Sequence, residues 1–238
     1  MAESTFEAAA AAITDIDHGA DPARIAEILL SVVPMDGGAV STLGNLLGAE
    51  TISATSLLAA RIDEVQFDLG EGPCWDALAS RRPVLEPDFA HRIGNEWPLF
   101  TEQVRRHRIG ALFAFPLTVG PMQIGAIDFY TVDASALTSE QIAETSLLAA
   151  VISRVILRRA IRLSERDLTL PETEYSRRVI HQATGIIVAQ LRLPPDDALL
   201  ILRGRAFASG RSMMDIATDI VERRVSFSAG PNGIEDTP

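Results

Sequence analysis

The chain has 238 residues, 47% of them hydrophobic, and a formal net charge of −11. This length allows one large domain or two small ones, each with its own core, and no apolar run reaches the roughly 18 residues that a membrane span needs. The single cysteine, Cys74, excludes an internal disulfide, and the first residues lack the features of a secretory signal. We therefore expect a globular, cytoplasmic protein that makes no contact with a membrane.

Charge is distributed unevenly along the chain. Residues 1–160 contain 11 arginines and 21 acidic residues, a net charge of −10, whereas residues 176–225 contain 8 arginines and 5 acidic residues, a net charge of +3. All 21 basic residues are arginines. The asymmetry predicts an acidic first domain and a small basic second domain that bind different partners.

The first 138 residues alternate between helical and strand patterns. Helices are predicted over residues 4–16, 22–32, 57–67, 73–80 and 97–107. Strands are predicted over residues 39–44 and 50–56, from residue 83, and most clearly over 109–119 and 121–132. The last two strands are joined by Gly120-Pro121, as in a hairpin. The pattern predicts an α+β domain, in which helices flank an antiparallel sheet.

A group of motifs in this part resembles a known family. The segments GEGPCWDALASRRPV (70–84), Trp97-Pro98, GALFAFPL (110–117) and IGAIDFYTV (124–132), with Asp88 between them, are similar to a GAF domain over roughly residues 10–160. The resemblance implies a central antiparallel sheet with a pocket on one face, and a sensor that responds to a small-molecule effector. It does not identify the ligand, because GAF domains bind cyclic nucleotides, tetrapyrroles, haem, other molecules or nothing.

Cys74 and its neighbour Trp75 are the candidate ligand-binding residues of this domain. Cys74 follows Gly72-Pro73 at the start of a predicted helix, where the helix dipole would stabilise a thiolate. Two interpretations follow. The thiol is a redox sensor or a bilin attachment site, or, as we favour, Cys74 is a small residue that packs a loop.

The sequence contains no evident metal site or catalytic motif. The four histidines, at positions 18, 91, 107 and 181, have no metal-ligand spacing to one another or to Cys74. No glycine-rich phosphate loop follows a strand, and no nucleophile and base form a recognisable motif. We therefore expect a protein that is not an enzyme, binds no metal and requires no cofactor.

Residues 139–168 are predicted to form one long helix, which Pro171 ends. Apolar residues recur in this segment every seven positions, at Ile142, Ala149, Ile156, Leu163 and Leu170. Nothing in the first domain obviously covers the second half of the helix, so we predict that it pairs with its copy as a parallel coiled coil in a homodimer. Arg159 and Arg166, at intervening core-type positions, weaken this prediction.

The stretch SRRVIHQATGII (176–187) predicts an amphipathic helix. Its apolar residues fall at intervals of three and four, at Val179, Ile180, Ala183, Ile186, Ile187 and Leu191. Polar residues and a glycine share the opposite face, namely Arg178, His181, Gln182 and Gly185, with Arg177 and Thr184 at its border. On spacing alone, an ordinary solvated face is the favoured interpretation.

Two further short helices are predicted after the break at 193–195. The first places Ala198, Leu202 and Ala206 inward and ends at Ser209-Gly210. The second is capped by Ser212 and packs through its apolar stripe, which comprises Met213, Ile216, Ala217, Ile220 and Val221. The three helices form a minimal all-α bundle, small enough that docking or dimerisation would help to stabilise it.

The combined pattern of these helices resembles an ANTAR domain. The matching strings are SRxVIxQAxGII, then DDALxxLRxxA, then MMDIAxxIV, in order over some fifty residues. The family, named for the AmiR and NasR transcription antitermination regulators, implies a dimeric output domain that binds two neighbouring RNA stem-loops in a nascent transcript and prevents a terminator hairpin. The chain departs from the family at Thr184, where lysine is usual, and at His181, where glutamate is usual, which puts RNA affinity and target choice in question.

With this resemblance, RNA contact becomes the favoured role of the polar face. The candidate RNA-binding residues are Arg177, Arg178, Gln182, Thr184, Gly185, Arg203 and Arg205. Arginine would supply phosphate contacts, and Gly185 would permit close approach. Arg203 has an alternative role as the partner of Asp215 or Asp219 in an ion pair. Stacking platforms are scarce, because Tyr175 and Phe207 are the only nearby aromatic residues and Phe207 is equally suited to the core.

Two other functions stay open. A DNA-binding regulator is disfavoured because the third helix carries Asp215, Asp219 and Glu222 on its polar side. A protein-interaction or dimerisation module without RNA binding is kept open by Thr184. The expected organisation is a sensor domain over 1–138, a connecting helix over 139–170, an RNA-binding three-helix domain over 171–226 and a disordered tail over 227–238.

Overall fold

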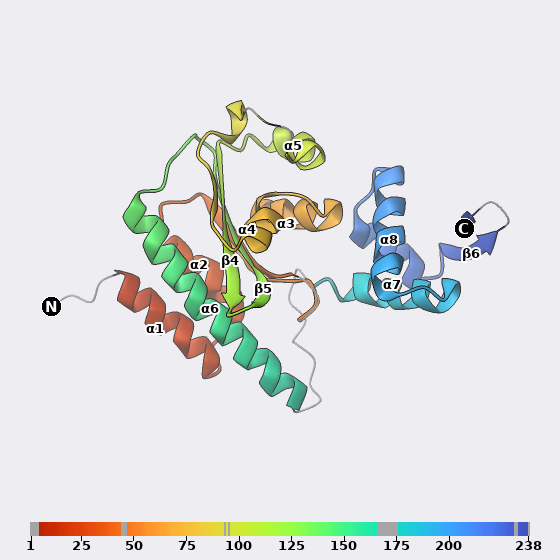
Figure 1. Ribbon diagram of the computed structural model, residues 1–238, viewed down its shortest axis with the longest axis horizontal. Coiled ribbons are helices and arrows are strands. Elements are labelled where there is room, and N and C mark those ends of the chain that lie inside the picture. Colours follow the sequence, from red (N-terminus) through yellow and green to blue (C-terminus); the bar gives the residue numbers. More distant parts are fainter. Residues whose placement is uncertain are drawn as a thin grey trace. The chain divides into compact units, whose positions relative to one another are not determined.

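A computed structural model of the chain describes residues 5–43, 47–92, 94, 96–165, 176–230 and 233–237. The chain divides into two units, residues 1–175 and 176–238, each described here by itself (Figure 1). The first contains a sheet flanked by helices and the second is mainly helical. The predicted fold class is confirmed.

A five-stranded antiparallel sheet forms the centre of unit 1, in the order β2-β1-β5-β4-β3. The strands are β1 (Gly37–Thr42), β2 (Glu50–Ala54), β3 (Val84–Glu86), β4 (Ala111–Val119) and β5 (Met122–Thr131). The predicted hairpin of β4 and β5 is present, with Phe113 opposite Phe129. Gly120 turns between them at φ +57°, a conformation that glycine adopts without strain.

Helices cover both faces of this sheet. They are α1 (Thr5–Asp17), α2 (Ile25–Leu30), α3 (Leu57–Leu69), α4 (Pro73–Ser80), α5 (Pro98–Val104) and α6 (Ser139–Glu165), with short 3₁₀ turns at Pro22–Arg24, Phe89–His91 and Arg105–His107. The helices α1, α2 and α6 lie on one face, and α3 and α4 lie on the other (Figure 1). Because side chains alternate along a strand, Phe113 and Phe115 enter the first core and Leu112 enters the second.

The long helix α6 begins at Ser139, as predicted. The side chain of Gln141 and that of Thr138 each accept a hydrogen bond from the other residue's backbone N–H, at 2.9 and 3.2 Å. This reciprocal arrangement satisfies an N–H that has no partner inside the helix.

The expectation that nothing in the first domain covers the second half of α6 is wrong. The helix packs on α1 and on β4, and Ala149 and Ile156 of the predicted coiled-coil stripe are buried in the sensor core. Near its end, Arg158 and Arg162 both form ion pairs with Asp17 of α1. The predicted stripe is therefore occupied within its own chain, and Leu170 lies outside the described residues.

Unit 2 contains the three predicted helices, α7 (Arg178–Leu191), α8 (Pro195–Ser209) and α9 (Met213–Val221). Their core is made of the residues predicted to face inward, including Ile180, Ala183, Ile187, Ala198, Leu202, Ala206, Met213, Ile216, Ala217 and Ile220. The hydroxyl of Ser212 accepts a hydrogen bond from the N–H of Asp215 at 3.0 Å and caps α9 as predicted. Gly210 ends α8 in the left-handed conformation, at φ +65°.

The prediction of a disordered tail is wrong for its described part. Residues Ser226–Gly230 (β6) and Gly233–Thr237 (β7) form an antiparallel hairpin. Phe227 is buried, and its N–H donates a hydrogen bond to the side-chain oxygen of Gln190 on α7 at 3.0 Å. The glycine-rich, polar composition of the segment indicated disorder, whereas one aromatic side chain suffices to anchor it against α7.

The Asp17 ion pairs generate a stability prediction. The hydrogen bond from Arg162, followed by the charges of Arg162 and Arg158, lowers the pKa of the Asp17 carboxyl below its ordinary value of 3.8. Because both arginines are about half exposed, solvent screens the pairs, and Asp17→Asn should lower the free energy of unfolding at pH 7 by about 1 kcal/mol. A depressed carboxylate pKa stabilises the fold above pH 3.8, and this stabilisation is lost as the pH falls through the lower folded value.

Urea denaturation of the wild type and Asp17→Asn at pH 7 and at pH 2.5 measures this effect. The difference between the two proteins should be present at pH 7 and should shrink at pH 2.5. Asp15→Asn, an exposed carboxylate on the same helix, is the matched control and should change the unfolding free energy little. An Asp17→Asn effect that is equal at both pH values would contradict the ion-pair origin.

Candidate nucleic-acid interface

The exposed face of α7 consists of the residues that the helical spacing predicted. Arg178, His181, Gln182 and Gly185 are exposed or half-buried, while the apolar residues Ile180, Ala183 and Ile187 are buried behind them. A Cβ added at Gly185 would meet nothing within 4 Å, so the backbone is accessible there. The face presents a guanidinium, an imidazole ring and an amide, and all three can form hydrogen bonds with a nucleic acid.

Arg177 does not lie on this face. Only 2% of the residue is exposed, although it was predicted to contact RNA from the border of the polar stripe. Arg177 is the N-cap of α7, and its carbonyl accepts hydrogen bonds from the N–H groups of Ile180 and His181 at 2.9 and 3.3 Å. At this position the residue opens the helix, and its side chain does not reach a ligand at the surface.

Thr184 is half-buried and directed toward its own helix. Its hydroxyl donates a hydrogen bond to the carbonyl of Ile180, one turn earlier, at 2.8 Å. The position where the family usually carries lysine therefore adds neither a charge nor a projecting donor to the exposed face.

Arg203 and Arg205 are half-buried on α8. Two residues apart on a helix, they extend toward opposite flanks, so they do not form one basic cluster on α8. Both predicted RNA-binding arginines are therefore partly accessible, on different sides of α8.

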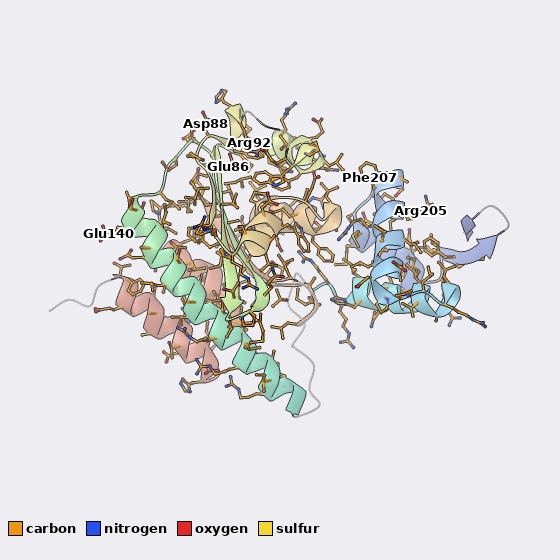
Figure 2. All side chains as sticks on the ribbon, in the orientation of Figure 1. Glu86, Asp88, Arg92, Glu140, Arg205 and Phe207 are labelled. Carbon is orange, nitrogen blue, oxygen red and sulfur yellow. The ribbon has the colours of Figure 1, made fainter. Side chains whose placement is uncertain are left out.

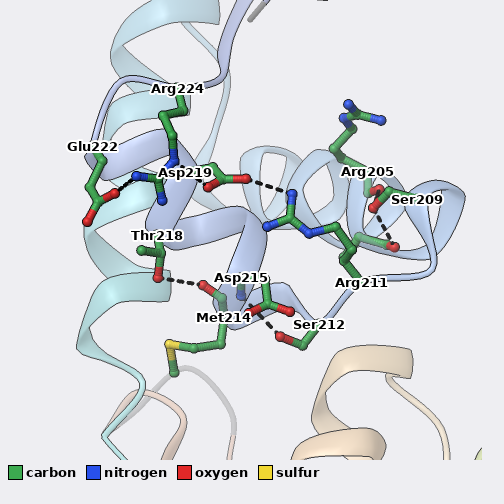
Figure 3. Close-up of polar contacts among 11 residues, drawn as sticks. Arg205, Ser209, Arg211, Ser212, Met214, Asp215, Thr218, Asp219, Glu222 and Arg224 are labelled. Atoms are coloured by element: carbon green, nitrogen blue, oxygen red, sulfur yellow. Dashed lines mark hydrogen bonds and ion pairs between the residues drawn. The ribbon is translucent and has the colours of Figure 1, made fainter.

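Asp219, a proposed partner of Arg203, forms ion pairs with two other arginines. Arg211 and Arg224 donate hydrogen bonds to its two carboxylate oxygens at 2.6 and 2.7 Å (Figure 3). The hydrogen bond from Arg211, and then that from Arg224, lowers the pKa of Asp219 below its ordinary value. Arg224 also pairs with Glu222. These contacts join the segments before and after α9, so the charges of Arg211 and Arg224 serve the fold of the domain.

Phe207 lies outside the core. It is 59% exposed on α8, which contradicts the interpretation of Phe207 as a core residue (Figure 2). The apolar residues at 198, 202 and 206 already defined the inward face of this helix, and Phe207 falls off that stripe. The signal was therefore present in the sequence spacing.

The two candidate ligand residues of unit 1 have structural roles. Cys74 is 1% exposed, and its N–H donates a hydrogen bond to the side-chain oxygen of Gln66 at 2.8 Å. The indole N–H of Trp75 donates to the carbonyl of the same Gln66 at 2.7 Å. Both residues join the start of α4 to α3, as the favoured packing interpretation of Cys74 expects, and a thiol this deeply buried is poorly placed for attachment or redox chemistry.

Aromatic residues fill the second core, under α3 and α5. Trp97, Phe100, Phe89 and Tyr130 are buried there, and Phe100 contacts the rings of both Trp97 and Phe89 edge-on. The guanidinium of Arg92 lies 4.2 Å from the centre of the Trp97 ring, and it covers this cluster from the outside.

A cavity of about 170 Å³ lies on the other side of the sheet, between β4 and α6. Its lining includes Arg81, Phe115, Thr118 and Ser146. Sites for drug-sized ligands have volumes of roughly 300–1,000 Å³, so this cavity is too small for haem or a tetrapyrrole.

Two searches of the described residues bear on other kinds of site. Among these residues, no three or more of histidine, cysteine, aspartate and glutamate are grouped so that they could hold a metal ion. No helix within the described ranges is both long enough and apolar enough to cross a membrane.

Family models match both units. The GAF domain model matches residues 3–157, and the ANTAR domain model matches residues 170–221. The chain belongs to the GAF domain family. Its C-terminal part is an ANTAR domain, as the sequence resemblance implied.

Solved structures with a similar fold include two GAF domains and a reductase. The GAF domain of the Acinetobacter phosphoenolpyruvate-protein phosphotransferase is 11% identical over 66% of this chain and 93% of its own, with a TM-score of 0.50. The GAF domain of a Coxiella burnetii phosphoenolpyruvate-protein phosphotransferase is 12% identical over 67% and 97%, with a TM-score of 0.49. Free methionine-R-sulfoxide reductase from Neisseria meningitidis is 12% identical over 69% and 96%, with a TM-score of 0.48. No curated protein matches the sequence.

The two domains define the general role of the chain. ANTAR domains are RNA-binding output domains of transcription antitermination, and GAF domains are sensors. Their combination is a regulatory arrangement rather than a catalytic one.

Proposed function

We propose that the chain is a transcription antitermination regulator in which the GAF domain controls a dimeric ANTAR domain that binds stem-loops in nascent mRNA. The observation that supports this function best is the exposed face of α7 inside the ANTAR match, with Arg178, Gln182 and Gly185 on it. Binding the stem-loops prevents the competing terminator hairpin from forming. The GAF domain responds to a small-molecule effector, and no cofactor is required.

The chemistry of the α7 face suits an RNA loop. The guanidinium of Arg178 pairs with a phosphate, and the amide of Gln182 both donates to and accepts from the edge of an unpaired base. Gly185 has no side chain to keep the nucleic acid away from the helix. Bases in loops are splayed and unstacked, so the side chains of Arg178 and Gln182 reach them without entering a deep groove.

Duplex DNA is a poorer partner for this domain. A recognition helix must present donors to the major groove and tolerate the flanking phosphates. On α9 the exposed Asp215 and, just past its end, the exposed Glu222 would face those phosphates, and α8 begins with the exposed acids Asp196 and Asp197. The charge of the domain therefore favours α7 and the arginine-rich end of α8 over α9 as the binding surface.

The homodimer is proposed to form through a different stripe of α6 from the one predicted from sequence. Leu147 is 58% exposed and Ile161 is 50% exposed, and these residues are two heptads apart. The exposed Arg154 lies midway between them, and the half-buried Leu157 follows it by three residues. Residues at this spacing line one seam of a coiled coil. The seam lies on the side of α6 that faces away from the buried stripe, so α6 is able to pack on its own sheet and on a second copy at once.

The role of Arg178 can be tested by removing its charge. Arg178→Ala should weaken binding to a tandem stem-loop RNA roughly 10-fold, because the variant cannot form a charge-assisted hydrogen bond. The slope of log affinity against log salt concentration should become shallower by roughly 0.7 for each phosphate that the variant no longer neutralises. Arg105→Ala, an exposed arginine of the GAF domain, removes the same charge and should leave both quantities unchanged. Duplex DNA that competes as well as the RNA would contradict the proposed function.

Thr184 offers a gain-of-function test. Thr184→Lys should raise RNA affinity about 3- to 10-fold and steepen the salt dependence, because the lysine stem can extend along the helix and place its ammonium at the surface. Thr184→Met has a similarly long unbranched stem without the charge and should bind like the wild type. If both variants gain affinity equally, or neither does, position 184 does not lie at the RNA.

The dimer can be tested by light scattering. The double variant Leu147→Glu, Ile161→Glu should have the mass of one chain at micromolar concentration where the wild type has the mass of two, because carboxylates cannot be buried in the seam. Leu57→Glu with Leu99→Glu, two exposed leucines elsewhere in the GAF domain, is the matched control and should stay dimeric. A wild type that is monomeric under these conditions would refute the proposed seam.

A further inference from the structure

The segment RGRAFASGR (203–211), at the end of α8, contains an exposed aromatic ring and three arginines. Phe207 is 59% exposed, whereas each of the other eight phenylalanines of the chain is buried or half-buried. Leaving such a side chain in water forgoes the free energy that its burial would contribute. An exposed ring on a regular helix is therefore a candidate binding element.

The neighbours of Phe207 in the sequence are mostly small. Four of them have small side chains or none: Gly204, Ala208, Ser209 and Gly210. A Cβ added at Gly204 or at Gly210 would meet nothing within 4 Å. The backbone at Phe207 is held in the helix, because its carbonyl accepts a hydrogen bond from the N–H of Gly210 at 3.1 Å in the cap that ends α8. With 59% of Phe207 exposed and open space at Gly204 and Gly210, the ring is accessible from solvent.

The charges around the ring have one sign. Arg203 and Arg205 precede Phe207 and Arg211 follows it, all within four residues, and this stretch contains no acidic residue. The acids of α8, Asp196 and Asp197, lie at its other end, ten or more residues and so about 15 Å along the helix. The Phe207 end of α8 therefore attracts phosphates even though Arg211 also holds Asp219.

We propose that Phe207 is a stacking platform for an unpaired base of the RNA, with Arg203, one turn earlier on the same side of α8, holding an adjacent phosphate. The proposal rests on the RNA-binding function above and adds a second, non-electrostatic contact to it. Unpaired bases stack on aromatic rings regardless of their identity, and an arginine-lined aromatic is the usual form of such a site. A second copy of this face is a poorer occupant, since face-to-face packing of the two rings would bring the same arginines together.

Stacking and phosphate contact differ in their salt dependence, which makes the role testable. The probe is a tandem stem-loop RNA with adenine loops in which one loop adenine is replaced by 2-aminopurine. Phe207→Ala in the full chain should weaken binding roughly 10- to 100-fold while the salt slope stays that of the wild type. The fluorescence quenching of 2-aminopurine on binding should disappear in Phe207→Ala and persist in Phe207→Trp.

Leu200→Ala is the matched control, because Leu200 is 62% exposed on the same helix but has no ring. It should change affinity less than 2-fold and leave the quenching intact. A wild type that does not bind the probe overturns the proposed function and the stacking role with it. If Phe207→Ala binds the probe as tightly as the wild type, the stacking role alone is overturned. The same holds if the mass of Phe207→Ala falls, as it would on dissociation from a protein partner, while its RNA affinity stays the same.

Discussion

The packing of α6 across the sheet is the contact on which the GAF domain depends. Ala149, Ile152 and Val155 are buried in its main core, and the ion pairs of Arg158 and Arg162 with Asp17 extend the docking to the last turns of the helix. Because Ala149, Ile152 and Val155 pack directly in the core beneath the sheet, a displacement of the sheet at these contacts moves this helix. The helix α6 lines the core of the GAF domain and is the last element of that domain. A rearrangement of the core would therefore be transmitted to α6. The same helix presents Leu147 and Ile161 outward, so the buried stripe and the proposed dimer seam belong to one helix.

Local chemistry made most of the fold predictable. The hairpin at Gly120-Pro121, the cap at Ser212 and the glycine end of α8 follow from residues within a few positions of one another, and each lies where the sequence indicated. The covering of α6 was not predictable in this way. Its partner α1 lies more than 120 residues earlier, and a stripe that repeats every seven residues suits α1 of the same chain as well as a second copy. The prediction of disorder for the C-terminal segment was wrong for a related reason. Composition averages over a whole segment, whereas the buried ring of Phe227 is a single contact within it.

The same distinction between local and long-range contacts applies to the candidate site. Helical spacing placed Arg178, Gln182 and Gly185 correctly on one face, because the direction of a side chain within a helix is fixed by its position. Spacing gave less information at the helix boundary, where Arg177 turned out to be buried at the N-cap. It also gave no information on ion pairs: Asp219 pairs with Arg211 and Arg224, which lie outside helices and are brought to it by the turns around α9. Counting arginines therefore overestimated the charge available for RNA.

That reduced charge has a consequence for how the ANTAR domain selects RNA. With Arg177 buried, Thr184 turned back to its own helix and two arginines tied to Asp219, the domain directs fewer charges to phosphates than its composition suggests. Each phosphate contact contributes affinity for any RNA, whereas contacts to splayed bases require an unpaired loop. We therefore expect the proposed surface of Gln182, Gly185 and the exposed Phe207, beside a small number of arginines, to gain a larger share of its binding energy from loops than from helical stems. The acidic GAF domain strengthens this bias, since its net negative charge repels RNA that the ANTAR domain does not hold by such contacts.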